Sequence, residues 1–250
     1  VNIQKAAVIG CGFVGSTIAY TLMQKGLFSE MVLLDANKAK AEGEAMDISH
    51  GLPFTHAMDI YAGEYEDIAD ASVVIITAGA NQKPGETRLD LVQKNAAIMR
   101  SIIKEIKRVN CEGILLIVSN PVDILTEVAL RESGFPKERV IGSGTVLDTA
   151  RLKYIISEKL DVDSRNVHAF IVGEHGDSEL AAWSCANIYG IKLQDFAKMR
   201  GYEHFAQDME EVYKGVRDSA YEIIERKGAT YYGIGMAAEK IVEAIVRNSH

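Results

Sequence analysis

Short apolar runs alternate with longer amphipathic stretches through the first half of the chain. The runs are rich in β-branched residues and nearly uninterrupted, which is typical of parallel strands covered on both faces. They comprise Ala6 to Ile9, Met31 to Leu34, Val73 to Thr77, Ile114 to Ser119 and Val140 to Ile141. The stretches between them predict helices over Val14 to Lys25, Ala39 to Ile48, Arg88 to Val109 and Pro121 to Ser133, with Gly26 and Gly134 as C-terminal caps. This alternation predicts an α/β fold with a Rossmann-type doubly wound parallel sheet.

The pattern loses its regularity after Gly144. It predicts one helix from about Leu147 to Leu160, one strand from His168 to Val172, and a mixed segment to Lys192. Two long helices follow, near His204 to Arg226 and Tyr232 to Asn248. We therefore predict two domains, residues 1–143 and an α+β domain over residues 144–250. Because no return strands follow the last amphipathic helix, we expect the second domain to be partial, with its C-terminal part missing.

The composition narrows the class of protein. The chain has 250 residues, of which 48% are hydrophobic and 25% charged, as in ordinary globular proteins. A net charge of −8 disfavours a nucleic-acid surface, which needs a basic stripe. The longest apolar runs are far shorter than the roughly 20 residues of a membrane span. Cys11, Cys111 and Cys185 lie far apart and fit neither a zinc site nor a disulfide framework, so we expect buried thiols, a reducing cytoplasm and no metal.

A glycine-rich turn follows the first predicted strand. Gly10, Gly12 and Gly15 form G-x-G-x-x-G, and the next strand ends at Asp35, 20 positions further on (35 − 15). In such a unit the glycines permit a tight turn, backbone approach to a pyrophosphate and close helix packing, while the acid receives the ribose hydroxyls. An acid also repels a 2′-phosphate, which favours NAD over NADP. The remaining predicted cofactor residues lie at the first helix or after later strands: Phe13, Val14, Gly79, Ala80, Ser119 and Asn120.

A second set of polar residues suggests acid–base chemistry. His175 lies in Gly173-Glu174-His175-Gly176-Asp177, directly after the predicted strand His168 to Val172. An imidazole titrates near neutral pH, although a loop histidine is also compatible with a solvated or structural role. Asp148 and Arg151 share a helix face, which fits either one cleft or a surface salt bridge. The polar segment from Gly79 to Arg88 fits a closing lid or a solvated loop.

These motifs, together with Ser143 to Arg151, resemble the bacterial L-lactate dehydrogenases of the lactate/malate dehydrogenase family over essentially all 250 residues. The resemblance implies an NAD-binding domain over residues 1–143 and a substrate domain over residues 144–250. It also implies reversible hydride transfer between NADH and pyruvate to give L-lactate, the last step of fermentative glycolysis, in the cytoplasm. A non-enzymatic reuse of the fold is the alternative from a different class.

The resemblance assigns a role to each polar residue. His175 matches the proton donor to the pyruvate carbonyl, and Asp148 the carboxylate that orients its ring. Arg88 matches the residue that polarises the carbonyl, and Asn120 one that helps hold it. Arg151 matches the residue that grips the substrate carboxylate, for which a guanidinium fork is well suited.

Two further residues bear on which acid is used. Gln82 stands where malate dehydrogenases carry an arginine, so a second substrate carboxylate has no cation to pair with. Thr230 matches the pocket residue of the lactate type. Both favour pyruvate and lactate, and a dehydrogenase of malate or another 2-hydroxy acid is the close alternative.

The family resemblance also extends to regulation and assembly. Bacterial members often bind fructose 1,6-bisphosphate, and the matching positions are Lys153 and His168. Lys153 replaces the more usual arginine and lacks its fork, so a surface lysine and a strand-end histidine remain the alternative. The resemblance further implies an allosteric homotetramer or a homodimer.

Overall fold

The computed structural model describes residues 1–80, 85 and 87–249, which form two compact units. Unit 1 contains residues 1–143 together with the segment from Tyr231 onward, and unit 2 contains residues 144–230. The predicted division at residues 143 and 144 would place the last helix in the second domain, and this division stays a prediction.

Unit 1 is built on a six-stranded parallel sheet with the strand order β3-β2-β1-β4-β5-β6. Its strands are β1 (Asn2–Ile9), β2 (Glu30–Leu34), β3 (Asp59–Ala62), β4 (Ala71–Ile76), β5 (Ile114–Ile117) and β6 (Val140–Gly142). Ile9 at the end of β1 pairs with Leu34 of β2 on one side and Ile76 of β4 on the other. The strand order reverses at β1, and in open α/β sheets ligands bind at such a switch point. The predicted fold class is confirmed.

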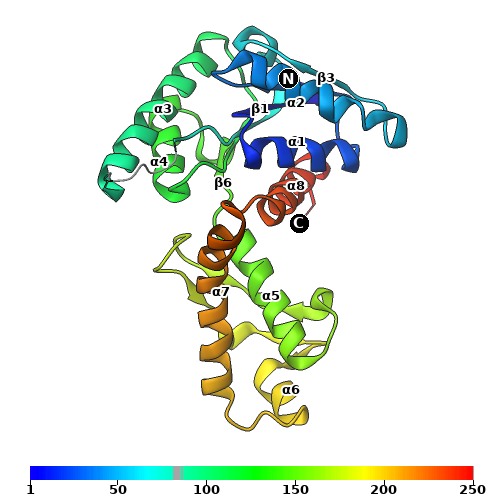
Figure 1. The fold of residues 1–250 in the computed structure, drawn as a ribbon, viewed down its shortest axis with the longest axis vertical. Coiled ribbons are helices and arrows are strands. Elements are labelled where there is room, and N and C mark those ends of the chain that lie inside the picture. Colours follow the sequence, from blue (N-terminus) through cyan, green and yellow to red (C-terminus); the bar gives the residue numbers. More distant parts are fainter. Residues whose placement is uncertain (81–84, 86, 250) are drawn as a thin grey trace. The chain divides into compact units, whose positions relative to one another are not determined.

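Alternating residues of the strands face two separate cores. Val8, Leu33 and Ile75 join one core with α1 (Phe13–Lys25), α2 (Lys38–Ser49) and α8 (Tyr232–Arg247). Val74 and Ile76 join the other core with α3 (Arg88–Arg108) and α4 (Val122–Ser133). Helices therefore cover both faces of the sheet (Figure 1), which is why its strands are apolar almost throughout.

The helix ends follow local signals that were readable in the sequence. Gly26 and Gly134 end α1 and α4 with φ of 67° and 66°, a left-handed conformation that glycine adopts without steric cost. Asn37 caps α2 and Thr87 caps α3 through their side chains. Every predicted helix is present with ends within a residue or two, whereas β3, a four-residue strand, was not predicted.

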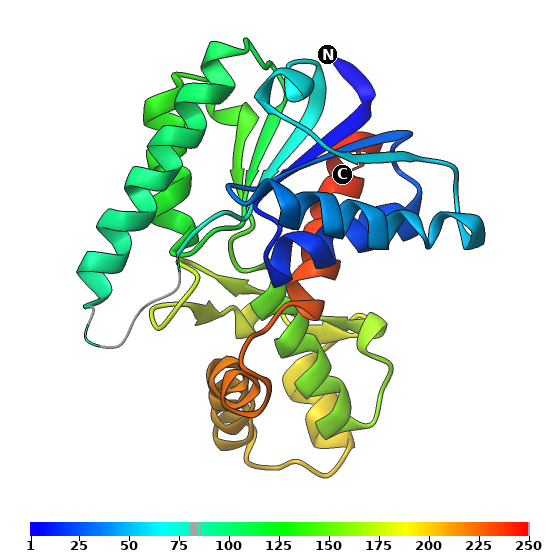
Figure 2. The same ribbon diagram turned by 45° about the horizontal axis from the view of Figure 1, so that its top comes forward.

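The helix α8 is part of unit 1 because it packs closely on α1 (Figure 2). A Cβ at Gly235 would lie 2.6 Å from the Thr17 side chain, so glycine permits this approach. The hydroxyl of Thr21 also donates to the Gly235 carbonyl at 3.2 Å. Within the described part of the chain, no helix combines the length and apolar character of a membrane span.

Unit 2 differs from the prediction at its strands. It contains α5 (Val146–Leu160), α6 (Leu193–Met199) and α7 (Phe205–Lys227) with five two-residue strands: β7 (Val167–His168), β8 (Ile171–Val172), β9 (Leu180–Ala181), β10 (Asn187–Ile188) and β11 (Ile191–Lys192). The single strand predicted over His168 to Val172 was wrong, because the chain changes partners within it. The strand β7 pairs with β10, whereas β8 pairs with β9. The helix α6 was not predicted.

Short 3₁₀ segments complete the chain at Leu52–Phe54, Tyr65–Ile68, Lys137–Arg139, Ser164–Asn166 and Trp183–Cys185. The last of these corrects the expectation for the cysteines: Cys11 and Cys111 are buried, but Cys185 is exposed. Trp183 of the same short helical turn packs against the apolar core of unit 2, whereas Cys185 is not part of that core. Burial raises the pKa of the Cys11 thiol to about 12, which makes it a poor nucleophile.

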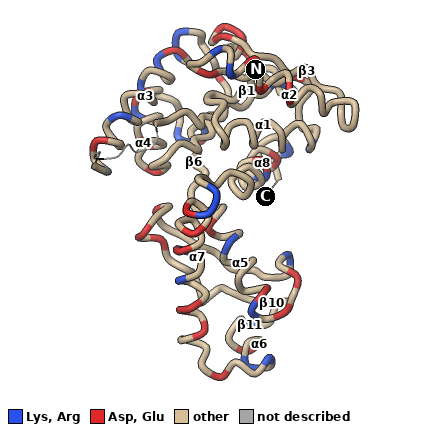
Figure 3. The backbone as a smooth tube through the Cα atoms, in the orientation of Figure 1, with Lys and Arg blue, Asp and Glu red and all other residues tan. Residues whose placement is uncertain are grey.

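Charged residues are spread over both units. Figure 3 shows Lys and Arg interspersed with Asp and Glu along α3 and α7. Their ion pairs include Arg108 with Glu66, and Arg226 with Glu222. Exposed pairs of this kind contribute little to stability.

Candidate active site

The glycine-rich turn after β1 has the geometry of a phosphate cradle. Gly10 has a φ of +101°, and a Cβ there would lie 2.6 Å from the backbone nitrogen of Ala78. A Cβ at Gly15 would lie 1.8 Å from the Gly10 carbonyl oxygen. A Cβ at Gly12 would meet nothing within 4 Å, although Gly12 is the N-cap of α1. The space before the helix N-terminus is therefore open, and that end of a helix attracts phosphate.

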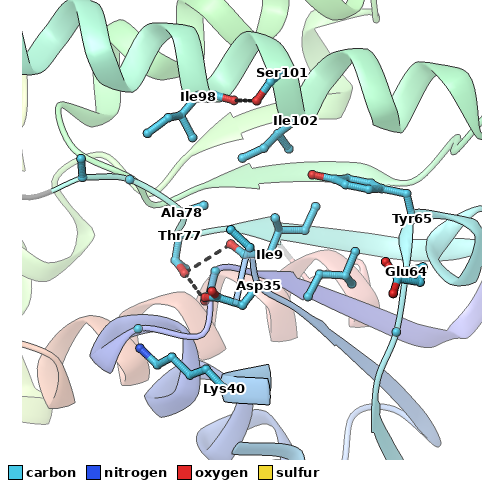
Figure 4. A pocket seen from close by; sticks show the side chains of 17 residues that line it. Ile9, Asp35, Lys40, Glu64, Tyr65, Thr77, Ala78, Ile98, Ser101 and Ile102 are labelled. Carbon is cyan, nitrogen blue, oxygen red and sulfur yellow. Dashed lines mark hydrogen bonds between the residues drawn. The ribbon is translucent and has the colours of Figure 1, made fainter. Parts of the chain in front are cut away.

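A cleft of about 680 Å³ opens at the same edge of the sheet (Figure 4). Asp35 and Lys40 lie on one wall, and Ile98 and Ile102 of α3 lie opposite. The predicted residues Gly10, Gly12, Gly79 and Ala80 also line it. An acid beside open space and an apolar wall suit a ribose and a planar base, so these residues fit an adenosine dinucleotide.

Asp35 is held in place by backbone donors. Its Oδ2 accepts from the backbone N–H of Cys11 at 2.7 Å, and its Oδ1 accepts from that of Asn37 at 2.8 Å. The carboxylate thus joins the glycine-rich turn to the start of α2. Each oxygen has a second lone pair, so these bonds leave acceptor capacity for ribose hydroxyls.

Four other predicted cofactor residues are not among those that line this cleft. Phe13 is 69% exposed and stacks on Tyr231 with the ring centroids 5.2 Å apart. Val14 packs against the core, and Gly15 is buried beneath the turn. The hydroxyl of Ser119 donates to the Ala78 carbonyl at 2.7 Å and so links the chain after β5 to the chain after β4.

Sequence reasoning missed Asn95, which organises this edge of the sheet. It is 3% exposed on α3. Its Oδ1 accepts from the Ala80 N–H at 2.8 Å, and its Nδ2 donates to the Asn120 carbonyl at 2.9 Å. The signal that could have identified Asn95 in the sequence is a single amide on the apolar face of a predicted helix. A buried amide nearly always has hydrogen-bond partners, so such a residue is expected to link neighbouring segments.

In unit 2 the first turn of α5 carries Asp148, which is 2% exposed. Threonines on either side of it clamp this turn to β8. Thr145 donates to the Ile171 carbonyl at 2.7 Å, and Thr149 accepts from the Ile171 N–H at 3.0 Å. The loop that leaves β8 therefore starts at a defined distance from Asp148, and this loop contains His175.

His175 and Arg151 both contact the Asp148 carboxylate. Nδ1 of His175 donates to Oδ2 at 2.5 Å, and Nη1 of Arg151 donates to Oδ1 at 2.9 Å. The hydrogen bond to Asp148 raises the pKa of His175, although burial opposes this. All three residues line one cavity of about 210 Å³. Because Asp148 is buried, the alternative of a surface salt bridge is wrong.

Glu179 completes this cavity and was not predicted. It is 4% exposed and lies directly before β9. Asp148, His175 and Glu179 each offer a potential metal-ligand atom within 4.8 Å of the others. The Arg151 guanidinium already pairs with Asp148, and its positive charge opposes a cation there. The expectation of no metal stays a prediction.

The other predicted residues lie apart or outside the described residues. Gln82 lies outside them, as do the side chain of Arg88 and half of the segment from Gly79 to Arg88. Arg88 is the first residue of α3. Thr230, between α7 and α8, is half-buried. Lys153 is half-buried on α5, and His168 is exposed on β7.

The doubly wound sheet, the open glycine turn and the acid after β2 define a dinucleotide-binding protein. Comparison with known proteins specifies the family. The family described as lactate/malate dehydrogenase, NAD binding domain, matches residues 4–142. The corresponding alpha/beta C-terminal domain matches residues 145–250. The chain therefore belongs to the lactate/malate dehydrogenase family, and the prediction of NAD as cofactor is confirmed.

Individual relatives are L-lactate dehydrogenases. One from Acetivibrio thermocellus is 56% identical over 248 residues, which are 99% of this chain and 78% of the relative. One from Priestia megaterium is 55% identical over 97% of this chain and 76% of the relative. A solved lactate dehydrogenase, MGS-M5, from a deep-sea metagenome is 53% identical, with a TM-score of 0.95 over 98% of this chain and 78% of its own. The solved structure of the minor L-lactate dehydrogenase of Enterococcus mundtii is 48% identical, with a TM-score of 0.94 over 97% of this chain and 77% of its own.

Proposed function

We propose that the protein is an NAD-dependent L-lactate dehydrogenase that interconverts pyruvate and L-lactate. The observation that carries this proposal is the buried Asp148 with His175 on one oxygen and Arg151 on the other, in a single cavity. This arrangement places a proton donor, His175, next to a cation that can bind the substrate carboxylate, Arg151. The same chain contains a dinucleotide cleft. Relatives named L-lactate dehydrogenase at 55–56% identity support the choice of acid.

NADH, when bound, supplies a hydride to the carbonyl carbon of the 2-oxo acid. His175 donates the proton to the carbonyl oxygen from Nε2, because Nδ1 is engaged with Asp148. Since Asp148 raises the pKa of His175, the imidazolium form persists to higher pH. Asp148 keeps the ring oriented and compensates its positive charge while the proton is held.

Arg151 binds the substrate carboxylate. It gives one N–H to Asp148 and has further donors in the same plane, which suit a bidentate pair with a second carboxylate. Its side chain is only 14% exposed, so water weakens this pair less than it would at the surface. Arg88 and Asn120 polarise and hold the carbonyl, as the family resemblance implies.

Gln82 and Thr230 set the preference for pyruvate over oxaloacetate. A neutral glutamine leaves a second carboxylate unpaired, which disfavours malate chemistry. Lys153 and His168 are proposed to bind fructose 1,6-bisphosphate, and the protein is proposed to be a cytoplasmic homotetramer or homodimer. Rates measured with and without fructose 1,6-bisphosphate on wild type and Lys153→Ala test the effector. Light scattering tests the assembly.

The function is tested with NADH and a panel of 2-oxo acids. We expect pyruvate to give a higher kcat/KM than oxaloacetate or branched 2-oxo acids. His175→Gln is expected to lower kcat/KM for pyruvate by roughly 10²- to 10⁴-fold, because general acid catalysis is lost. NADH affinity, measured by fluorescence titration, serves as the control and should be unchanged. Near-normal turnover by H175Q would contradict the mechanism.

A further inference from the structure

Glu179 is a buried carboxylate to which the mechanism above gives no role. Its backbone N–H donates to the Gly176 carbonyl at 3.2 Å, and its own carbonyl accepts a hydrogen bond from the Tyr213 hydroxyl of α7. The loop from Gly173 to Glu179 is therefore anchored at its far end as well as at β8. This anchoring directs the Glu179 side chain into the cavity that holds Asp148 and His175.

Two buried carboxylates, those of Asp148 and Glu179, line this cavity. Asp148 and Glu179 are 2% and 4% exposed, and their carboxylate oxygens come within 4.8 Å of each other. Two ionised carboxylates at this distance repel each other strongly, so one of them holds a proton when His175 is neutral. Asp148 already accepts from His175 and Arg151, which stabilise its ionised form. The shared proton therefore belongs on Glu179, whose pKa is raised to about 7 by burial and by Asp148.

The remaining charged groups around Glu179 come from three elements. Arg151 faces it from α5, Asp177 from its own loop, and Arg217 from α7, and all three line the same cavity. The positive charges of His175 and Arg151 lower the pKa of Glu179, and the ionised Glu179 in turn raises the pKa of His175. Protonation of His175 and of Glu179 therefore oppose each other.

We propose that Glu179 is a positioning residue that takes up a proton from water when His175 gives one to the substrate, which keeps the charge of the buried cluster constant. This inference rests on the proposed function. One proton leaves Nε2 of His175 for the substrate oxygen, and one enters the Glu179 carboxylate, so the cluster of Asp148, His175 and Glu179 begins and ends with the same net charge. No electrons move within the cluster.

The coupling has a catalytic consequence. Without an ionisable Glu179, the imidazolium form of His175 loses a neighbouring anion, and the cluster loses the group that takes up a proton as His175 becomes neutral. The proton affinity of His175 then depends on Asp148 and Arg151 alone. The enzyme would hold its catalytic proton over a narrower range of pH.

The test compares the pH dependence of kcat/KM for pyruvate in wild type and Glu179→Gln. Glutamine has the shape of a protonated glutamate and cannot ionise. At pH 8 we expect kcat/KM to fall about tenfold in E179Q, because the loss of a nearby anion lowers the fraction of imidazolium. At pH 5.5, where His175 is protonated in both proteins, we expect rates within about twofold of each other.

Two control variants accompany this test. Glu174→Gln removes an exposed carboxylate one residue from His175, and we expect the wild-type profile because water screens that charge. Glu179→Asp keeps an ionisable group and is expected to restore most of the activity at pH 8. Equal losses at both pH values in E179Q, or a similar loss at pH 8 in E174Q, would overturn the proposal.

A second readout does not depend on turnover. The His175 ring resonance can be assigned among the six histidines with H175Q and followed by NMR in the unliganded protein. In wild type we expect a titration broader than a single-site curve, because two coupled groups share the range. In E179Q we expect a single-site curve with a lower midpoint. A single-site curve in wild type would overturn the proposal even if E179Q failed to fold.

The two readouts separate the proposals. If pyruvate is not reduced but the His175 titration shifts in E179Q, the proposed function fails and the coupling stands. If pyruvate is reduced and neither the profile nor the titration changes, Glu179 has no positioning role and the proposed function stands.

Discussion

At the scale of single residues, the chemistry of this protein depends on which oxygen each donor reaches. Asp148 is useful because its two oxygens have different partners, His175 on Oδ2 and Arg151 on Oδ1. The residue types and their spacing were readable in the sequence. That Asp148 is buried, and that Glu179 joins it, was not readable, because residues 148 and 179 are brought together only by packing of α5 against β8 and the loop after it.

Glu179 is expected to cost stability at neutral pH. In the folded protein its pKa is about 7, whereas the ordinary value is 4.5. Between these values the folded state holds a proton that the unfolded state has released, so stability falls as pH rises through this window. Glu179→Gln removes this effect. We expect E179Q to melt a few degrees above wild type at pH 8 and at the same temperature near pH 4.5. Calorimetry at both pH values checks this, and an equal shift at both would contradict it.

Asp35 is expected to decide the choice of dinucleotide. Asp35→Asn keeps an oxygen for one of the backbone donors, Cys11 or Asn37, but removes the charge that repels a 2′-phosphate. We expect the ratio of kcat/KM for NADH over NADPH to fall at least about tenfold, because hydrogen bonds from the ribose hydroxyls to a charged carboxylate are stronger than those to an amide oxygen. Steady-state rates with both cofactors measure this ratio. An unchanged ratio would show that selectivity lies elsewhere in the cleft.

At the scale of elements, most boundaries followed from local signals. Amphipathic period, caps and glycine terminators are properties of neighbouring residues, and they placed the predicted helices to within a residue or two. The strands of unit 2 were harder. Each has two residues and exists because of its partner, so β7 and β8 could not be distinguished from one continuous strand. Likewise β3 depends on pairing with β2.

The turn from β1 to α1 offers a matched pair of variants. In Gly15→Ala the new Cβ would lie 1.8 Å from the Gly10 carbonyl oxygen, so the turn must deform. In Gly12→Ala the methyl group meets nothing within 4 Å and projects into the space before the helix N-terminus. We expect G15A to lower both the melting temperature and NADH affinity. G12A should leave the melting temperature unchanged and raise the Kd for NADH. If G15A kept both the melting temperature and the NADH affinity of wild type, the close packing of Gly15 against the Gly10 carbonyl would be contradicted.

At the scale of the whole molecule, the chain forms two compact units, and unit 1 is built from two stretches of sequence that are separated by unit 2. The segment from Tyr231 onward belongs to unit 1, although it follows all of unit 2 in the chain. The buried Ala238 and Val242 of α8 join the same core as α1 and the sheet. The nucleotide cleft and the acid–base cavity therefore belong to units that are each built from a distinct core.

A variant of Gly235 tests this membership. Gly235→Leu would push α8 away from Thr17 of α1, so we expect a lower melting temperature and faster hydrogen exchange in β1 and α1. Exchange in α5 and α7 should be unchanged, since they belong to unit 2. Gly43→Ala on α2 is the control, because its Cβ would meet nothing within 4 Å. Equal acceleration in both units would show that α8 is not specific to unit 1.

The sequence by itself determined the alternating elements, the glycine turn with Asp35, and the motif around His175, because each depends on residues close together in the chain. Tertiary structure alone decided that Asp148 is buried, that Asn95 ties Ala80 to Asn120, and that Glu179 joins the acid–base cluster. The physical reason is desolvation. The pKa of a carboxylate and the strength of its hydrogen bonds depend on how much water remains around it, and only the packing of distant segments removes that water.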